Sequence, residues 1–272
     1  MSTITSDAST ITPDTWRKPP AIANPVLRYG LVIAIAVYVI WALSTLPFDW
    51  NRVSDGIGRA GRIFFGAFPP SFERPGLMIE GFLESLQIAV IATAAGVLLS
   101  VPIALMSARN LAPMPIYLLG RGIIICARSF HPVIVAIIFV KAVGFGPLAG
   151  MLTLTVYSIG FVAKMLAERI EEIDWGQVEA VRSAGATYIG TLIYAVFPQI
   201  MPRQIGLSIY QLDSNLRASA VVGIVGAGGI GATLANAFKR YDYDFALAIT
   251  MVIVGAILIS EAVSGMIRKR IW

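Results

Sequence analysis

Residues 81–106 read GFLESLQIAVIATAAGVLLSVPIALM, an apolar run with a single charged residue, Glu84. At 1.5 Å per residue, about 20 helical residues cross the ~30 Å hydrocarbon core of a bilayer, so this run can span a membrane. Comparable runs lie on both sides of it: residues 29–46, 116–140, 147–166, 205–225 and 245–267. The pattern predicts an all-α, polytopic membrane protein with about six transmembrane helices.

The composition supports a membrane protein. Of the 272 residues, 57% are hydrophobic and 14% are charged, and the mean hydropathy is +0.76. A soluble domain of this length needs a larger polar surface. The net charge of +5 does not indicate nucleic-acid binding, because no basic patch is interleaved with aromatic residues. Cys126 has neither a disulfide partner in this chain nor metal-ligand spacing, and is expected to be a packing residue.

The chain is expected to divide into two parts. Residues 1–28 are rich in Ser, Thr and Pro and lack an apolar stretch, which predicts a disordered cytoplasmic tail. Residues 29–272 form the expected transmembrane domain. Within it, residues 51–68 alternate apolar and basic side chains, as in a helix lying in the membrane interface. The third span contains two arginines and Pro132, so we expect it to be bent.

The six predicted spans place both termini on the same side of the membrane. Lys and Arg are more frequent in the segments on that side, and cytoplasmic loops carry such an excess. Both termini are therefore expected in the cytoplasm. The polar segment at residues 168–192, between the fourth and fifth spans, then faces the cytoplasm too.

One motif lies inside this polar segment. Glu179–Gly185 reads EAVRSAG, and Pro198 follows thirteen positions beyond Gly185. This spacing resembles the EAA motif of ABC importer permeases, with Val181 in the place of the third motif residue. The resemblance implies a cytoplasmic coupling helix that seats in a groove of a separate ATPase subunit. The residues that it assigns to coupling are Glu179, Ala180, Arg182, Gly185 and Pro198.

The pattern of side chains around the motif fits an amphipathic helix. Apolar residues recur at three- and four-residue spacing, opposite Glu179 and Arg182. They are Trp175, Val178, Val181, Tyr188 and Leu192. Gly185 would let a partner backbone approach closely, despite about 1 kcal/mol of lost helix propensity. An ordinary amphipathic surface loop is the alternative interpretation.

A second resemblance concerns the solute. LDSNLR at 212–217 and VGIVGAGGIG at 222–231 are similar to the fifth-span region of phosphonate permeases. The segments 84–86 (ESL), 107–110 (SARN) and 128–132 (RSFHP) also fit, although His131 departs from the family pattern. The resemblance covers about residues 80–270. It implies a type I ABC importer permease fold, a bacterial inner membrane location and import of phosphonate, with phosphate or phosphite as further candidates.

The glycines after the fifth span allow two interpretations. Gly226–Gly231 fits G-x-G-x-x-G, but the dinucleotide fingerprint also requires a βαβ unit. Between membrane spans we expect a flexible or close-packed turn instead, at the external end of the fifth span. Gly226, Gly228 and Gly229 are then candidates for an external gate. Gly228→Val should impair transport while the complex still assembles.

Charged residues inside spans commonly face an aqueous path or one another. Arg121 and Arg128 are seven residues apart, hence on one face, and Asp213 and Arg217 are one helical turn apart. One interpretation is a cation-lined path for an oxyanion. The other is a structural Asp213–Arg217 ion pair, with Arg121 extending to the interface. The candidate path residues are Arg128, His131, Asp213, Asn215 and Arg217. For His131, a packed or pore-facing polar group is favoured over a proton relay.

The sequence contains no nucleophile–base pair, metal constellation or P-loop motif, so a transport subunit without enzymatic activity of its own is expected. No cofactor is expected on this chain. The resemblance implies a second permease copy, two ATPase subunits that bind ATP and Mg²⁺, and an extracytoplasmic solute-binding protein. The alternatives are a permease for methionine or another small solute, a secondary transporter that needs no ATPase, and a membrane enzyme.

Overall fold

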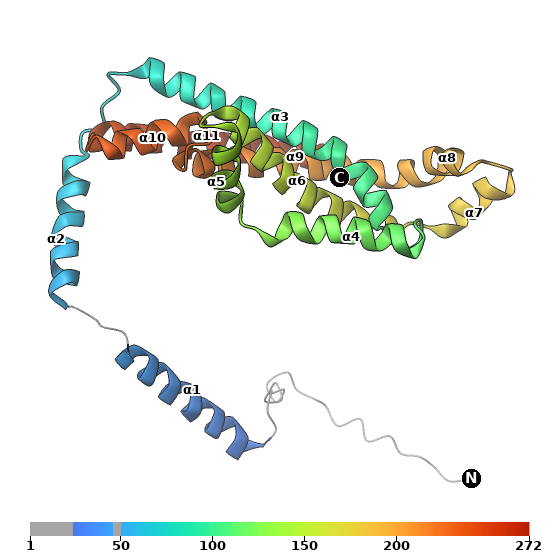
Figure 1. Cartoon of the computed structure of the whole chain (residues 1–272), viewed down its shortest axis with the longest axis horizontal. Coiled ribbons are helices and arrows are strands. Elements are labelled where there is room, and N and C mark those ends of the chain that lie inside the picture. The colour runs from blue at the N-terminus through green and yellow to red at the C-terminus, as the bar shows by residue number, and fades with distance from the viewer. Residues whose placement is uncertain (1–23, 46–49, 272) are drawn as a thin grey trace, which may run out of the picture. The chain divides into compact units, whose positions relative to one another are not determined.

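The computed structural model describes residues 24–45 and 50–271 (Figure 1). Every regular element in these ranges is a helix, which confirms the all-α prediction. The expected disordered tail lies outside the described residues except for its last five positions, and helix α1 already begins at Pro25. The chain divides after Arg59 into two units, which are described separately.

The first unit holds α1 (Pro25–Thr45), which corresponds to the first predicted span. No residue of α1 is buried within the described structure. Helix α2 (Trp50–Gly66) continues across the division between the units and confirms that residues 51–68 are largely helical. It is strongly amphipathic, in agreement with an interfacial helix.

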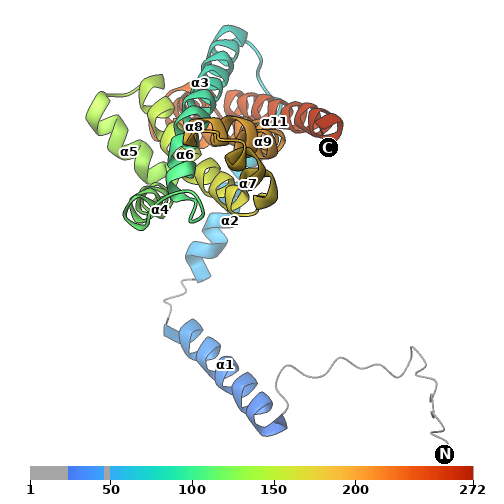
Figure 2. The same ribbon diagram turned by 90° about the vertical axis from the view of Figure 1, so that its right-hand side faces the viewer.

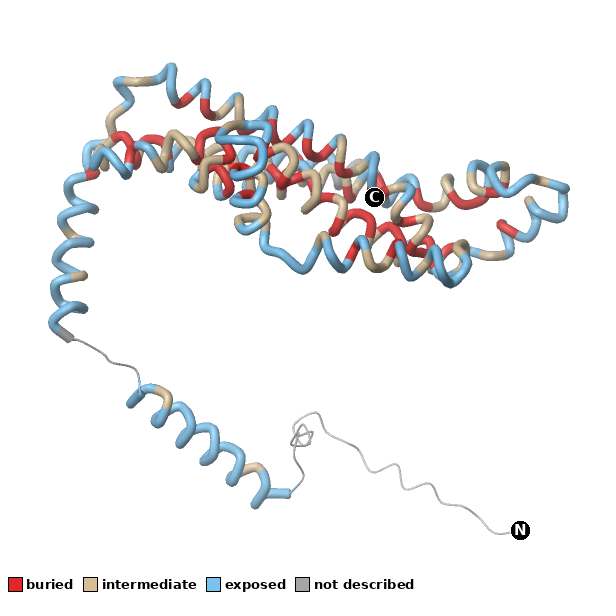
Figure 3. The backbone as a smooth tube through the Cα atoms, in the orientation of Figure 1, coloured by how far each residue is buried: buried red, intermediate tan, exposed pale blue. Residues whose placement is uncertain are grey.

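Three long helices form the centre of the second unit: α3 (Pro75–Ser107), α6 (Pro147–Glu171) and α9 (Phe197–Ile224). Their facing surfaces are buried, and α3 packs most extensively against α6 (Figure 3). Small residues permit this close approach. A Cβ added to Gly96 of α3, for example, would lie 2.3 Å from the Cβ of Ser158 in α6. Such contacts are typical of helix interfaces in membranes.

The third predicted span is two helices, α4 (Met114–Ser129) and α5 (Pro132–Val143), which meet at 91°. The bend is therefore confirmed. Phe130 and His131 adopt extended backbone conformations, and Pro132 opens α5. Proline is suited to the first turn of a helix because its missing N–H would have no partner there. The described part of the chain has five other helices long and apolar enough to cross a membrane, and the bent pair makes six if it is counted as one broken span.

The polar segment and the last third of the chain complete the unit. The short helices α7 (Trp175–Ser183) and α8 (Tyr188–Thr191) follow α6, and a π-helix, Leu192–Val196, leads into α9. Beyond α9 come α10 (Gly229–Lys239) and α11 (Tyr243–Ile271). Helices α7 and α8 lie at one end of this unit and α10 lies toward the other (Figures 1 and 2). The separate helix α10 was not expected from the sequence.

Candidate functional site

Helix α7 is attached to α9 at its first turn. The Oδ1 atom of Asp174 caps the helix by accepting a hydrogen bond from the Gly176 amide at 2.9 Å. The Asp174 amide in turn donates to Oε1 of Gln199 at 2.9 Å, and Nε2 of Gln199 donates to the Ala195 carbonyl at 2.8 Å. Hydrogen bonds therefore join the start of α7 to the start of α9.

The predicted apolar stripe packs as expected at four of its five positions. Val178 is buried, and Trp175, Val181 and Leu192 pack against the same core cluster, which contains Leu166 and Ile170 of α6. The prediction is wrong for Tyr188, which is 55% exposed. Because α7 ends at Ser183, Tyr188 lies in α8 and Leu192 lies in the π-helix, so the five residues do not form one helical stripe, although Leu192 still packs against the cluster.

Gly185 ends α7 and does not lie within a helix, contrary to expectation. Its φ is +84°, a conformation that glycine adopts without steric cost. The Ala186 amide donates to the Val181 carbonyl at 3.4 Å and the Gly185 amide donates to that of Arg182 at 2.9 Å, the two bonds of a Schellman cap. A Cβ at Gly185 would meet no atom within 4 Å, so the space beside it is open.

The remaining motif residues are exposed. Glu179, Ala180 and Arg182 project from α7, and the Arg182 guanidinium lies 5.6 Å from the centre of the Trp175 ring. Pro198 is exposed at the start of α9. Because Pro198 has no N–H, it fits the first turn that follows the π-helix, where the Phe197 amide donates to the Leu192 carbonyl.

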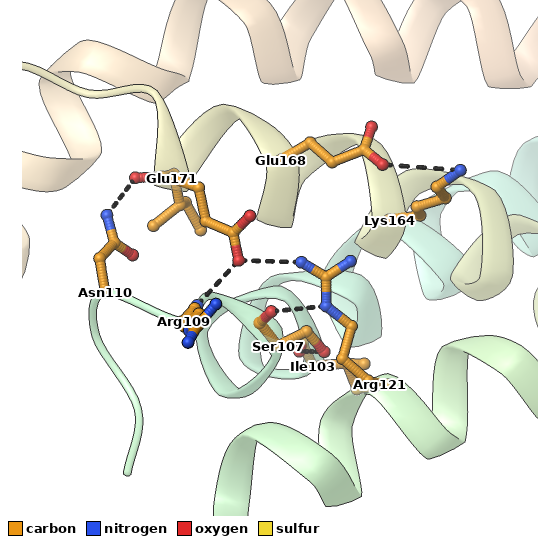
Figure 4. A network of polar contacts seen from close by, with 9 residues as sticks. Ile103, Ser107, Arg109, Asn110, Arg121, Lys164, Glu168 and Glu171 are labelled. Atoms are coloured by element: carbon orange, nitrogen blue, oxygen red, sulfur yellow. Dashed lines mark hydrogen bonds and ion pairs between the residues drawn. The ribbon is translucent and has the colours of Figure 1, made fainter. Parts of the chain in front are cut away.

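A polar network that sequence reasoning missed joins the end of α6 to α3 and α4 (Figure 4). Oε1 of Glu171 accepts from the Arg109 amide and from Nη2 of Arg121, both at 2.9 Å. Nε of Arg121 also donates to the Ser107 carbonyl at 3.0 Å, and Nδ2 of Asn110 donates to the Ile170 carbonyl at 2.8 Å. Arg121 is therefore paired with Glu171 at the end of α6, and its expected extension to the membrane interface stays a prediction.

The glycine segment after α9 forms a close-packed turn. Gly226, Gly228 and Gly229 have φ values of +98°, +80° and +73°. The Gly146 amide donates to the Gly226 carbonyl at 3.1 Å, and the Ile230 amide donates to Ser85 Oγ at 2.9 Å. The described residues contain no βαβ unit, so the dinucleotide interpretation is rejected.

The contacts of Gly228 change what its replacement is expected to do. An added Cβ would lie 2.7 Å from Oε1 of Glu84 and 2.8 Å from the backbone nitrogen of Pro147. A valine would also have to adopt a positive φ. Gly228→Val should therefore disturb the packing of α3 and α6 as well as transport, so assembly would not remain unaffected.

The predicted ion pair on α9 is present. Nη2 of Arg217 lies 3.1 Å from Oδ2 of Asp213, and Oδ1 of Asp213 accepts a hydrogen bond of 2.7 Å from Ser260 in α11. Asp213 is buried, whereas the Arg217 side chain is 53% exposed. The hydrogen bond from Ser260 thus links Asp213 of α9 to α11, and the Arg217 guanidinium remains accessible.

Asn215 is part of a buried network between three helices. Its Nδ2 donates to Thr93 Oγ1 in α3 and to Ser158 Oγ in α6, both at 2.8 Å, and its Oδ1 accepts from Gln211 at 2.9 Å. Asn215 is fully buried, so its assignment to a transport path is corrected. It fixes the packing of the central helices.

Two of the predicted path residues meet at a cavity of about 310 Å³ between α5, α6 and α9. His131 lines it from the start of α5 and Arg217 lines it from α9. Arg128 is exposed at the end of α4, three residues before His131, and is not among the lining residues. The structure thus separates the motif residues of α7 from the residues that line this cavity along α9.

Comparisons with known proteins agree with this architecture. The chain is 39% identical to the phosphate-import permease protein PhnE of Mycolicibacterium smegmatis over 93% of its length, and spans about half (48%) of that relative. It is 37% identical to the phosphite transport system permease protein PtxC of Stutzerimonas stutzeri, over 89% of this chain and 88% of that one.

Solved structures and a family model identify the fold. The methionine ABC transporter MetNI, in inward-facing conformations, superposes with a TM-score of 0.64 at 22% identity, over 74% of this chain and 99% of the matched chain. The second unit thus has the fold of a type I ABC importer permease. The family model of the binding-protein-dependent transport system inner membrane component matches residues 100–272. The chain therefore belongs to the family of binding-protein-dependent transport system inner membrane components.

Proposed function

We propose that this chain is the membrane permease subunit of an ATP-driven importer for phosphonate, phosphate or phosphite. The relatives that are 37% and 39% identical are named for phosphite and phosphate transport, which supports a small phosphorus oxyanion as the solute. The similarity to a methionine transporter is more distant and indicates the fold alone. On this proposal the chain carries the solute and binds no nucleotide or cofactor itself.

The observation that carries the proposal is the construction of α7. Its motif residues Glu179 and Arg182 are exposed, while its apolar face packs against α6 and Asp174 is bonded to Gln199 of α9. A surface that is exposed to a partner and rigidly attached to the central helices suits the transfer of movement. In the proposal a cytoplasmic ATPase subunit, with ATP and Mg²⁺ bound to it, holds this surface.

The remaining partners follow from the same architecture. We place a second copy of the permease beside the first, so that the solute passes between them, and a second ATPase subunit on the other copy. An extracytoplasmic binding protein delivers the solute at the end that holds α10. Both termini then lie in the cytoplasm of a bacterial cell, with the chain in its inner membrane.

The test is uptake into proteoliposomes that contain the chain, its ATPase and its binding protein. We expect ATP-dependent uptake of methylphosphonate, phosphate or phosphite that exceeds uptake of methionine. An ATPase variant that binds but does not hydrolyse ATP is the control and should stop uptake. Uptake that persists without the ATPase would identify a secondary transporter and refute the proposal. A preference for methionine would refute the assigned solute.

A further inference from the structure

The cavity between α5, α6 and α9 combines a few polar groups with apolar walls. Its polar lining consists of His131, Tyr157, Ser214 and Arg217, and all its other lining side chains are apolar. A volume of about 310 Å³ is at the lower end of the ~300–1,000 Å³ typical of small-molecule sites. His131 and Arg217 are exposed at this cavity, so solvent reaches the charged group and screens part of any interaction that it makes.

Arg217 is held in place but keeps most of its donors. Within the described residues, its guanidinium makes one hydrogen bond, to Oδ2 of Asp213. Ser260 occupies the other carboxylate oxygen of Asp213. A guanidinium has five N–H donors in a planar fork that matches carboxylate and phosphate oxygens. The ion pair therefore orients Arg217 and leaves N–H groups for a further anion.

One ring nitrogen of His131 is bonded to the backbone, and the other is left as a donor. Its Nδ1 accepts a hydrogen bond of 3.3 Å from the Val133 amide and so caps α5. An acceptor Nδ1 places the proton of the neutral ring on Nε2. In the described part of the chain, Nε2 makes no hydrogen bond, nor do the hydroxyl groups of Tyr157 and Ser214. Three donors on three helices thus join Arg217.

The charge of the lining indicates the class of ligand. No carboxylate lines this cavity, whereas three other cavities of the second unit include Glu168, Glu84 and Asp242, respectively. A zwitterionic amino acid would find no acidic partner for its ammonium group in this lining and would place that group near the Arg217 guanidinium, which repels it. A tetrahedral oxyanion needs only donors, and this lining provides them.

We propose that this cavity is an oxyanion-binding site of the permease, in which Arg217, His131 Nε2, Tyr157 and Ser214 donate to a phosphonate or phosphate group. The inference rests on the proposed function and extends it by naming the residues that select the solute. The same chemistry would also hold the phosphate of a lipid headgroup, so the experiment must separate the two sources.

The test is binding of radiolabelled methylphosphonate to the complex of permease and ATPase in phosphatidylcholine nanodiscs, without the binding protein. We expect saturable binding at millimolar concentrations and none of methionine. His131→Asn keeps an oxygen that caps α5 but loses the imidazole, and Tyr157→Phe loses a hydroxyl that has no partner in the described chain. Each should weaken binding about tenfold, the value of one hydrogen bond to a charged group.

Two further variants complete the design. Arg217→Lys keeps a cation beside Asp213 but replaces the planar guanidinium and its paired N–H donors by an ammonium group. It should therefore also weaken methylphosphonate binding about tenfold or more. Lys141→Gln is the control. It removes a cation from α5, the helix that His131 caps, at a position outside the cavity. It should bind as the wild type does. His131→Asn and Tyr157→Phe should retain the thermal unfolding temperature of the wild type.

The outcomes separate the two proposals. If wild-type uptake favours no oxyanion, the proposed function fails and this site fails with it. If uptake proceeds but binding is unsaturable, or is unchanged in all three cavity variants, only the site is refuted. Phospholipid that co-purifies is measured in parallel by mass spectrometry. Loss of that lipid from the Arg217→Lys complex, with methylphosphonate binding unchanged, would assign the cavity to a headgroup and also refute the solute site.

Discussion

Gly185 and Gly190 place different demands on the backbone of the coupling segment, although only five positions separate them. Gly185 has a φ of +84° and open space where a Cβ would lie, so a side chain there would meet backbone strain and no clash. Gly190 lies in α8 with ordinary contacts of 3.5 Å around an added Cβ. Conformation alone therefore distinguishes the two positions.

We expect Gly185→Ala to destabilise the end of α7 by about 1–2 kcal/mol, the cost of a left-handed conformation for a residue with a Cβ. Gly190→Ala is the control and should be neutral or stabilising by up to about 1 kcal/mol, because alanine favours a helix. Hydrogen exchange of the amides at 176–191 measures both. Equal protection in the two variants would contradict the role of Gly185 as the helix cap.

The contacts of Glu171 predict a measurable coupling with Arg121. The two side chains are 32% and 24% exposed and their ion pair is 2.9 Å long, so solvent screens it only partly. A double-mutant cycle with Glu171→Gln and Arg121→Gln should give a coupling energy of about 1 kcal/mol in thermal unfolding. The same cycle for Arg169 and Glu172, which are more exposed, should give a smaller value. Additive effects at Glu171 and Arg121 would show that the ion pair contributes nothing.

At the scale of helices, hydropathy located the spans but not their ends. The second predicted span begins at residue 81 and the fifth at residue 205, whereas α3 begins at Pro75 and α9 at Phe197. A helix continues past the apolar run wherever its backbone remains hydrogen-bonded, and hydropathy does not report that. Hydropathy also does not reveal the 5-residue π-helix or the 11-residue α10, because both are shorter than a membrane span.

The candidate site was predictable where a motif has fixed spacing and less so where contacts cross between helices. Glu179 and Arg182 are exposed on a helix, as expected, because local periodicity places them. Glu171 and Arg109 were missed because their contact joins residues 62 positions apart. The sequence shows that Asn215 is a polar residue within a span, which predicts a path residue. It does not show which face of α9 is buried.

The buried network around Asn215 predicts a cost that an exposed position of α9 does not share. Asn215→Leu removes three hydrogen bonds, and such bonds contribute on average ~0.6 kcal/mol each in a membrane, so about 2 kcal/mol of stability should be lost. Leu212→Ala, on the exposed side, should change stability by less than about 0.5 kcal/mol. Unfolding in a denaturing detergent measures both. A similar loss for the two variants would argue against the network.

For the molecule as a whole, the proposed orientation is open to a labelling test. Ser183 is exposed at the end of α7, and Tyr241 is exposed between α10 and α11. Helices α7 and α10 lie toward opposite ends of the second unit (Figure 1). Cys126 is exposed and must first be replaced by alanine. Ser183→Cys should then react with an impermeant thiol reagent only in inverted vesicles, and Tyr241→Cys only in intact cells. The reverse pattern would place the termini outside.

The right angle between α4 and α5 interrupts what would otherwise be one continuous transmembrane helix. Helix α4 packs against α3 and α6, whereas α5 packs against α6 and α9, so the two halves share α6 and differ in their second neighbour. Phe130 and His131 alone connect them. A change in this angle requires rotation about the backbone of these two residues, and rotation at His131 would also disturb its cap on the Val133 amide. Movement of α5 would displace the cavity wall that carries His131, whereas the contacts of Glu171 with Arg109 and Arg121 lie outside α5.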